Sequence, residues 1–264
     1  MHKPPVTALV LSRNEQDIIE RCIRSLSWAD EIVVIDDFST DETVERCRAL
    51  GCTVHQRHFD YYGNQGTWGW QFCRNRWVFQ LDADEECTLE LQDSILQLFE
   101  SEPEHAAYRM LIRPTFMGKE IKHGSWGGKL RVRLYRRDRV RYEGPRNHES
   151  IQVEGTVGTL QGAYFHHTFR EMNHWIEKVV WYAQFGSETA FERNQKPSYK
   201  NLLLRPVAHF LNSYIRRLGF LDGKEGLIIA GCEAVTIFLR YCYLFEMLQQ
   251  NNPEDYKPSQ RRNS

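Results

Sequence analysis

Four carboxylates follow directly on a short apolar run in the stretch Trp77-Val78-Phe79-Gln80-Leu81-Asp82-Ala83-Asp84-Glu85-Glu86. The apolar half predicts a strand covered on both faces, as in the parallel sheet of an α/β domain, where ligands bind beyond the carboxyl ends of the strands. Asp82 and Asp84 would repel each other unless a cation lay between them, and Mg²⁺ or Mn²⁺ prefers carboxylate oxygens. We therefore expect a metal site at Asp82 and Asp84. The alternative is a solvated acidic turn before a helix that begins after Thr88.

Strands and helices alternate on the amino-terminal side of this stretch. The predicted strands are Val6–Leu11, Glu31–Asp36 and Cys52–His55, and the first two are followed by residues at helical spacing. Such alternation predicts a doubly wound, mostly parallel sheet, in which the loops after strands one, two and four meet at one edge. We expect four acids to converge there: Glu15, Asp36, Asp82 and Asp84.

The loop after the second strand also carries helix-start signals. Ser39 and Glu42 have the spacing of a capping box, which predicts a helix from this point. Asp37 and Asp41 stand where acids favour a helix amino terminus, so we assign them to helix-start chemistry.

Composition limits the possible functions. The chain has 264 residues, is 41% hydrophobic and carries a formal net charge of −1, which argues against a general nucleic-acid binder. Its seven cysteines include no C-x-x-C pair, and no apolar signal region precedes Val6, so we expect a reducing, cytoplasmic setting. No G-x-G-x-x-G follows the first strand and no Walker loop occurs, so metal would have to neutralise any bound diphosphate.

These segments carry a resemblance to a known family. Val6 to Leu98 resembles the nucleotide-sugar-binding half of glycosyltransferase family 2, the inverting enzymes with a GT-A (Rossmann-like) fold. The matching pieces are Ser12-Arg13-Asn14-Glu15, Val33 to Asp41, and Leu81 to Glu86 in the position of the family's DxD motif. Three later segments resemble the branch that contains lipopolysaccharide core glycosyltransferases: Arg131 to Arg137, His148-Glu149, and Gly219 to Gly226.

The resemblance implies roles for individual residues. Asp36 matches the aspartate that reads the nucleobase, and a carboxylate suits the imino N–H of uracil. Glu15 matches a position near the same nucleoside, while Asp82 and Asp84 match the pair that faces the ribose and the metal-bridged diphosphate. Related sequences usually have a basic residue close to Gln65, after Gly63. This chain has Gln65-Gly66-Thr67 instead, so it departs from the family at the position of the expected phosphate contact.

The second half of the chain must supply the catalytic base, because inverting transfer needs a carboxylate that removes the acceptor hydroxyl proton. The turn before His148 and Glu149 and the resemblance place this pair near the acceptor, with Glu149 as the base. The alternative is that Glu149 pairs with an arginine. The resemblance makes His166 a candidate third metal ligand, because some GT-A enzymes use a late histidine, although a lone inward histidine is more often a core residue. Trp126, on a glycine-rich loop, suits stacking on an acceptor sugar or anchoring its own loop.

Helical spacing returns after Trp175 and predicts a long helix that ends before Pro197. The segment from Gly226 to Leu248 is almost long enough to span a bilayer, but Glu233, Arg240 and Glu246 interrupt it. We expect helices that pack on the catalytic domain or a surface that rests on anionic lipid.

The predicted organisation has four parts. Residues 1–115 form the nucleotide-sugar-binding half, residues 116–195 form an acceptor-side extension with the base, residues 196–250 form carboxyl-terminal helices, and residues 251–264 form a disordered tail.

The sequence thus predicts an inverting hexosyltransferase that depends on Mg²⁺ or Mn²⁺. It would move a hexose, with glucose expected, from a UDP-sugar to a saccharide or lipid-linked saccharide acceptor in lipopolysaccharide or other cell-surface glycan assembly, at the cytoplasmic face of a membrane. Two alternatives stay open. A sugar nucleotidyltransferase would need a glycine-rich basic loop after the first strand, and a non-catalytic GT-A scaffold would bind nucleotide-sugar or glycan without turnover.

Overall fold

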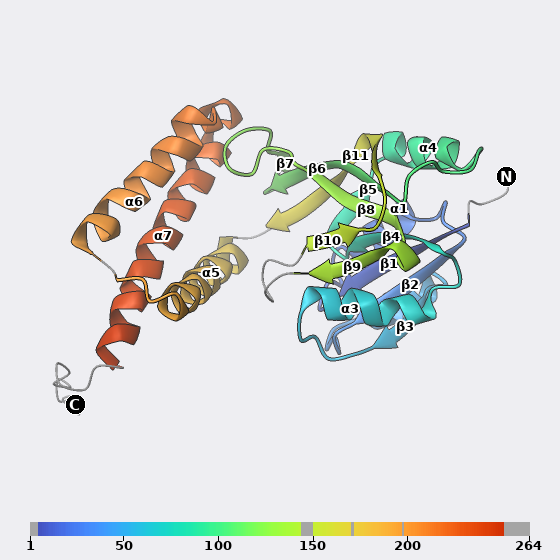
Figure 1. Cartoon of the computed structure of the whole chain (residues 1–264), viewed down its shortest axis with the longest axis horizontal. Helices are drawn as coiled ribbons and strands as arrows, with labels where there is room; N and C mark the ends of the chain where they lie inside the picture. Colours follow the sequence, from blue (N-terminus) through green and yellow to red (C-terminus); the bar gives the residue numbers. More distant parts are fainter. Residues whose placement is uncertain (1–4, 144–149, 170–171, 197, 251–264) are drawn as a thin grey trace. The chain divides into compact units, whose positions relative to one another are not determined.

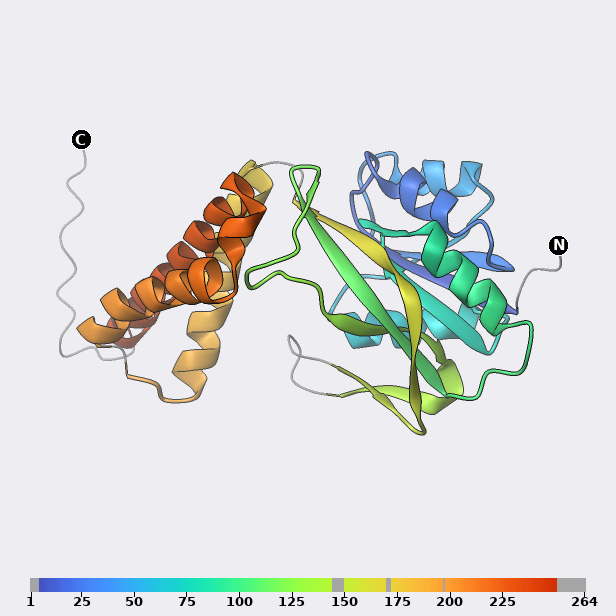
Figure 2. The same ribbon diagram turned by 90° about the horizontal axis from the view of Figure 1, so that it is seen from above.

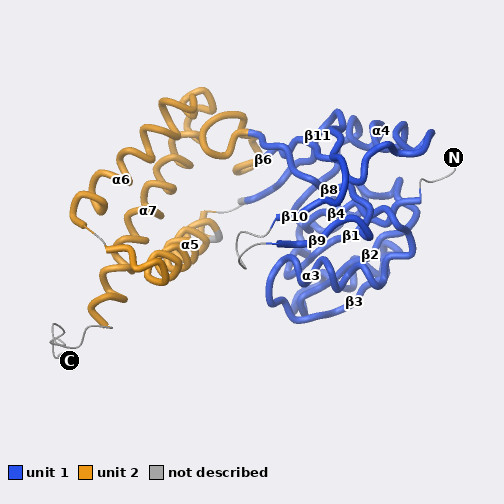
Figure 3. The backbone as a smooth tube through the Cα atoms, in the orientation of Figure 1, with its two compact units in different colours: residues 1–114, 128–168 blue, residues 115–127, 169–264 orange. Residues whose placement is uncertain are grey.

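The computed structural model describes residues 5–143, 150–169, 172–196 and 198–250, and the chain divides into two compact units (Figure 3). Unit 1 comprises residues 1–114 and 128–168, and unit 2 comprises residues 115–127 and 169–264. The finer four-part division expected from the sequence stays a prediction, and its last part, residues 251–264, lies outside the described residues.

Unit 1 is built on a sheet with the strand order β3-β2-β1-β4-β8-β6-β11-β5 (Figure 1). Its parallel half contains β1 (Val6–Ser12), β2 (Glu31–Asp36), β3 (Thr53–Gln56) and β4 (Trp77–Asp82). Its other half contains β8 (Leu130–Arg136), β6 (Ala107–Phe116), β11 (Val157–Phe169) and β5 (Glu85–Cys87). Antiparallel pairing joins β4 to β8, β8 to β6 and β11 to β5. A separate hairpin joins β9 (Val140–Glu143) to β10 (Ser150–Val153).

Helices cover both faces of the sheet, as a doubly wound fold requires. On one face lie α1 (Ile19–Ser25), α2 (Thr43–Ala49) and α4 (Leu89–Leu98), whose buried side chains pack with Val10, Val34 and Leu81 (Figure 2). On the other lie α3 (Tyr62–Gly69) and the short η1 (Trp70–Phe72), whose aromatic rings pack on Leu9, Ile35 and Val78. β1 is buried along its whole length, and its sequence is mostly apolar, with Thr7 and Ser12 as the buried polar residues. The predicted fold class is confirmed.

The helices of unit 1 begin and end at residues with a clear local reason. Gly51 (φ +81°) ends α2 in the left-handed conformation, which lets the Cys52 N–H bond the carbonyl of Cys47. Thr88 caps α4, because its hydroxyl accepts the Leu91 N–H. Since β5 separates Asp82 and Asp84 from this cap, neither acid belongs to the first turn of α4.

The predicted capping box in the β2–α2 loop is wrong. Helix α2 begins at Thr43, and no side-chain hydrogen bond caps it at Glu42. The Ser39 hydroxyl instead bonds Asp36 and accepts the Asn14 N–H, because the preceding loop competes for it. Asp41 does serve the helix start, by accepting the Thr43 N–H (3.0 Å). Asp37 does not, since its carboxylate bonds Arg13 and Phe59.

Unit 2 is largely helical. It contains β7 (Lys119–Glu120), α5 (Met172–Glu192), α6 (Tyr199–Leu211), a π-helical turn (Asn212–Arg216), a 3-10 turn (Gly219–Asp222) and α7 (Lys224–Gln250). Helix α7 packs against both α5 and α6. The long helix predicted after Trp175 is confirmed as α5, whose Trp175 and Val179 share an apolar cluster with Ile229 of α7.

Within the described residues, α7 is the one helix with the length and apolar composition to cross a membrane, a test that the core helices of globular proteins also pass. Its Glu233 has partners inside unit 2. Glu233 accepts hydrogen bonds from the hydroxyls of Ser125 and Ser213, and lies 3.4 Å from His209.

Candidate functional site

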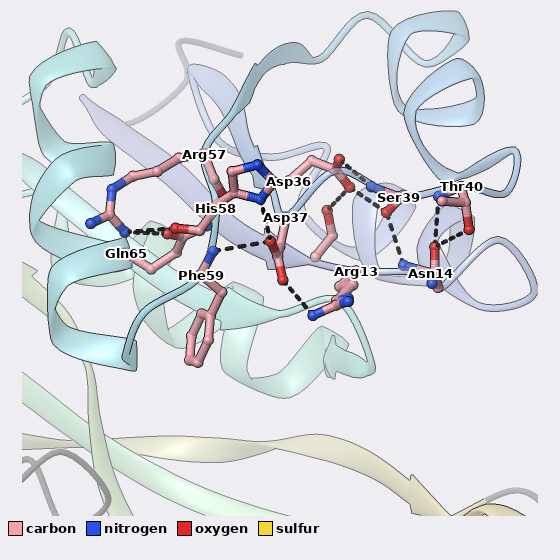
Figure 4. Close-up of polar contacts among 11 residues, drawn as sticks. Arg13, Asn14, Asp36, Asp37, Ser39, Thr40, Arg57, His58, Phe59 and Gln65 are labelled. Atoms are coloured by element: carbon pink, nitrogen blue, oxygen red, sulfur yellow. Dashed lines mark hydrogen bonds and ion pairs between the residues drawn. The ribbon is translucent and has the colours of Figure 1, made fainter.

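Hydrogen bonds join the two loops that follow β1 and β2 at their carboxyl ends. The Asn14 side-chain oxygen accepts the Thr40 N–H (2.8 Å), while the Asn14 N–H donates to Ser39 (Figure 4). The Glu15 N–H donates to Thr43, so backbone and side chains of both loops form one network. Asn14 adopts φ +52°, a conformation that asparagine tolerates better than most residues. These contacts fix the positions of the β1 and β2 loops before any ligand binds.

Asp36 lies fully buried at the centre of this network. One carboxylate oxygen accepts from the hydroxyls of Ser12 and Ser39, and the other accepts from the Ser39 N–H and the Gln56 amide. An ionised carboxylate offers about four lone-pair sites, so these four donors use its capacity. Reading of a nucleobase by Asp36 stays a prediction, and it would require one of these donors to leave.

Asp37 has more capacity for a ligand than Asp36. Its oxygens accept from the Arg13 guanidinium (2.8 Å) and the Phe59 N–H (3.0 Å), with the His58 ring 3.8 Å away. Next to it, Phe38 adopts φ +46°, a strained conformation for a bulky side chain, and its exposed ring lies 4.1 Å from that of His58. A charged pair and an exposed aromatic pair thus lie side by side beyond β2.

Gln65 is buried on α3 and pairs with Arg57, which follows β3. Its side-chain oxygen accepts from the Arg57 guanidinium (2.6 Å), and its amide donates to the Arg57 carbonyl (3.1 Å). The sequence near Gln65 lacks a basic residue, yet the fold supplies one from another element. Asp60 accepts from the same guanidinium, and this bond lowers the pKa of Asp60 well below its usual range.

The acids after β4 are organised by a buried arginine. Arg133 of β8 donates to the Glu85 carboxylate (2.6 Å) and lies 3.4 Å from that of Asp82. The other Glu85 oxygen accepts the Asp82 N–H (2.9 Å), so Glu85 holds the backbone of Asp82. Burial raises the pKa of Glu85, while the charge of Arg133 works against that rise. Antiparallel pairing of β8 with β4 brings Arg133 to the strand end, which the linear sequence did not reveal.

His166 and Asp84 meet, as the sequence suggested. The imidazole Nε2 lies 3.3 Å from the Asp84 carboxylate, because β11 pairs with β5 at His166 and Glu85. Burial works to lower the pKa of His166, but the hydrogen bond and charge of Asp84 outweigh it and raise that pKa to about 9. His167 points elsewhere, with Nε2 3.0 Å from Glu86.

Asp82, Asp84 and His166 fit a divalent ion by the chemistry of their donor atoms, which are carboxylate oxygens and an imidazole nitrogen. Over the part of the chain that the structure describes, no three His, Cys, Asp or Glu side chains form a ready ligand cluster. Mg²⁺, however, usually binds through one or two carboxylates and takes its other ligands from water and substrate phosphates. The residues present therefore suffice for an ion that arrives with a diphosphate.

A polar cluster connects the acid strand to the β9–β10 hairpin. The hydroxyls of Tyr135 and Tyr142 both donate to the Gln80 side-chain oxygen, two residues before Asp82. The Tyr142 ring also stacks on Trp70 at 5.8 Å. The hairpin is thus anchored beside β4. The predicted acceptor-side residues His148 and Glu149, which lie between β9 and β10, are outside the described residues.

Trp126 belongs to unit 2 and packs into an apolar cluster. Its ring lies 5.7 Å from that of Trp175 and 6.1 Å from that of Phe116. The half-buried ring therefore anchors its loop, and stacking on an acceptor sugar stays a prediction.

Comparison with known proteins identifies the class. The profile described as "Glycosyl transferase family 2" matches residues 7–157, which contain β2 to β10, all of β1 except Val6, and the acids Asp36, Asp82 and Asp84. The chain belongs to this family and is a glycosyltransferase.

Two curated relatives match nearly the whole chain. The lipopolysaccharide core biosynthesis glycosyltransferase LpsC of Rhizobium meliloti is 27% identical over 253 residues, covering 90% of this chain and 94% of that protein. An uncharacterized glycosyltransferase of Rickettsia bellii is 27% identical over 268 residues, covering 94% and 88%.

Solved structures give weaker likenesses. A mycobacterial protein matches 65% of this chain and 69% of its own, at 16% identity and a TM-score of 0.47. Glucosyl-3-phosphoglycerate synthase from Mycobacterium tuberculosis, in complex with Mn²⁺, UDP-glucose and phosphoglyceric acid, matches 42% and 44%, at 19% identity and a TM-score of 0.37.

Proposed function

We propose that this glycosyltransferase moves a hexose, with glucose as the expected sugar, from a UDP-sugar to a saccharide or lipid-linked saccharide acceptor, with inversion. The observation that carries the proposal is the contact between His166 and Asp84 (3.3 Å), two residues after Asp82 at the carboxyl end of β4, next to the strands whose loops, after β1 and β2, are hydrogen-bonded to each other. Similarity to LpsC supports lipopolysaccharide or related glycan assembly as the setting.

In this proposal Asp82, Asp84 and His166 hold Mg²⁺ or Mn²⁺, which when bound would supply positive charge to the departing diphosphate. Glu85 keeps the Asp82 backbone in place, and Arg133 keeps Glu85 in place. Arg133 also adds a fixed positive charge to an acid-rich site, which favours an anionic ligand.

The nucleoside would lie beyond β1 and β2. In this proposal Asp36 reads the nucleobase and Glu15 lies near the same nucleoside. Gln65 is proposed to contact the nucleoside together with Arg57. Asp37 and the Phe38–His58 ring pair join this proposal, because an exposed aromatic surface suits the face of a base.

Glu149 is proposed as the base that takes the acceptor hydroxyl proton, and His148 and Trp126 as acceptor contacts. Support comes from the strand that leads into residues 144–149. Tyr142 of β9 is hydrogen-bonded to Gln80 of β4, so β9 is held beside the acid strand where it leads toward residue 144.

The proposed setting is the cytoplasmic face of a membrane. All seven cysteines are free thiols and five of them are buried, which suits a reducing compartment. A lipid-linked acceptor would explain peripheral attachment there.

Calorimetry with UDP, in the presence and absence of Mn²⁺, tests the donor site. We expect metal-dependent binding that Asp84→Ala weakens about a hundredfold or more, since losing a charged ligand removes several kcal/mol of interaction. Asp93→Ala is the control, because Asp93 is an exposed acid on α4 in the same unit. Metal-independent UDP binding would remove the metal assignment. Binding without any turnover of UDP-hexoses would favour the non-catalytic scaffold.

A further inference from the structure

Exposed apolar side chains gather on one face of α6 and the turns that follow it. Leu204, Val207, Leu211, Ile215 and Leu218 recur every three or four residues and are all exposed, with Leu204 at 63% and Leu211 at 51%. We call these five residues the α6 ridge. Most of the other exposed large apolar side chains of the described chain also lie in unit 2, whereas unit 1 has few.

The opposite face of α6 already has its partner. Leu202 packs into a cluster with Tyr241 and Leu244 of α7, and the Arg205 guanidinium lies over the Tyr241 ring at 5.8 Å. His209 faces Glu233 of α7 at 3.4 Å. Helix α6, which lies beside α7 in Figure 1, therefore docks on α7 through one face, and the exposed ridge is on its other side. Among the described residues of unit 2, no helix covers the ridge.

The ridge lies in a segment of the chain whose charged residues are all basic. Residues 199–221 contain Lys200, Arg205, Arg216 and Arg217 and no acid. Lys200 lies four residues before Leu204 and so on the same helical face, while Arg216 and Arg217 are exposed between Ile215 and Leu218. The next acid, Asp222, is buried and accepts the His123 N–H, so it does not offset these charges at the surface.

An apolar face with basic residues and no acids suits the boundary of an anionic bilayer, where apolar side chains enter the acyl region and basic groups meet phosphates. A second copy of the chain is a poorer occupant. In a two-fold dimer the ridge would face itself, and its basic residues would oppose their own copies. We propose that unit 2 binds the surface of an anionic phospholipid bilayer through the α6 ridge, with Lys200, Arg216 and Arg217 in the headgroup layer.

This inference goes beyond the proposed function, because it assigns membrane contact to α6 and does not depend on catalysis. It also differs from insertion of α7, since Glu233, near the middle of α7, is hydrogen-bonded to Ser125 and Ser213 within unit 2.

The test is co-sedimentation of the full chain with vesicles of phosphatidylcholine alone or mixed with phosphatidylglycerol. We expect binding to the mixed vesicles, and each of Leu204→Glu and Leu211→Glu should weaken it about tenfold or more, because an exposed leucine that would enter the acyl region is replaced by a charge. Leu89→Glu is the matched control, since Leu89 is 77% exposed but lies in unit 1. The pair Arg216→Gln and Arg217→Gln should weaken binding chiefly to the anionic vesicles and reduce its salt dependence.

UDP calorimetry and circular dichroism on each variant show whether it is folded, and they separate this test from the test of the donor site. The inference is overturned if the full chain does not co-sediment with either kind of vesicle, or if the ridge variants bind vesicles as tightly as the native chain does. It is also overturned if Leu211→Glu converts a dimer to a monomer and the native chain does not bind vesicles, because the ridge would then be a subunit interface.

Discussion

At the scale of single residues, Arg133 has the largest structural influence on the candidate site. Its guanidinium bonds Glu85 and the hydroxyls of Tyr62 and Tyr164, and its side chain is only 14% exposed. Because the Glu85 carboxylate is fully buried, removal of Arg133 would leave a charge without its partner. The arginine thus acts on Asp82 in two ways: directly, across 3.4 Å, and through the buried Glu85 carboxylate, which accepts the Asp82 N–H.

We expect Arg133→Met to destabilise unit 1 by about 3–5 kcal/mol, the usual cost of breaking a buried ion pair from one side. Urea unfolding followed by tryptophan fluorescence measures this loss. The double variant Arg133→Met with Glu85→Gln should recover much of it, because no unpaired charge remains. Arg76→Met is the control. Arg76 pairs with Asp138 at the surface, where such pairs contribute about 1 kcal/mol or less. Equal losses at the two positions would contradict the buried-pair argument.

The sequence motifs were enough to predict most of the residues of the candidate site, but not the contacts between strands that are distant in the sequence. The contact between Asp84 and His166 could be anticipated, because both were candidate ligands of the same metal ion. The sequence could not place Arg133 beside Asp82, because that contact depends on the register between β8 and β4. The register of β8 with its other neighbour, β6, is irregular at Tyr108 and Arg109, which no sequence pattern shows. Ser39 was assigned to a cap because local spacing cannot show that Asp36 and Asn14 compete for it.

At the scale of elements, the passage of β11 over the start of α4 sets the position of His166. Thr88 caps α4 and also donates to the Ala163 carbonyl (2.6 Å), so cap and strand share one hydroxyl. Gly162 makes this approach possible. It has φ +82°, and a Cβ there would lie 2.4 Å from the Leu91 nitrogen. Parallel strands β1, β2 and β4 were predictable from apolar runs, but this close crossing of strand and helix was not.

Gly162→Ala should therefore destabilise unit 1 by about 2 kcal/mol or more, from a left-handed backbone together with overpacking. Gly51→Ala is a matched control, because Gly51 has φ +81° in the same unit but has no atom within 4 Å of its Cβ position. That control should lose only about 1 kcal/mol. Thermal and urea unfolding of both variants give the difference, which isolates the clash. If both variants lose the same amount, the close approach of β11 to α4 is not what requires glycine.

At the scale of the whole molecule, the two units have separate apolar cores. One pair of clusters lies within unit 1 on the two faces of its sheet, and the other pair joins α5, α6 and α7 within unit 2. A ligand that binds one unit stabilises that unit by mass action, by about 2.7 kcal/mol at a hundred times its dissociation constant. Separate cores confine this gain to the unit that holds the ligand.

Hydrogen exchange of the full chain can therefore assign each ligand to its unit. With UDP and Mn²⁺ in hundredfold excess over the dissociation constant, the slow amides of β1, β2 and β4 should exchange about a hundredfold more slowly, because opening of unit 1 must first release the ligand. The amides of α7 should exchange at their original rates. Anionic vesicles should slow the amides of α6 instead and leave β4 unchanged. The Asp84→Ala variant should lose the first effect and keep the second, whereas Leu211→Glu should do the reverse. Equal protection of β4 and α7 by UDP would show that the two cores open together, and the separation of donor binding from membrane binding would then fail.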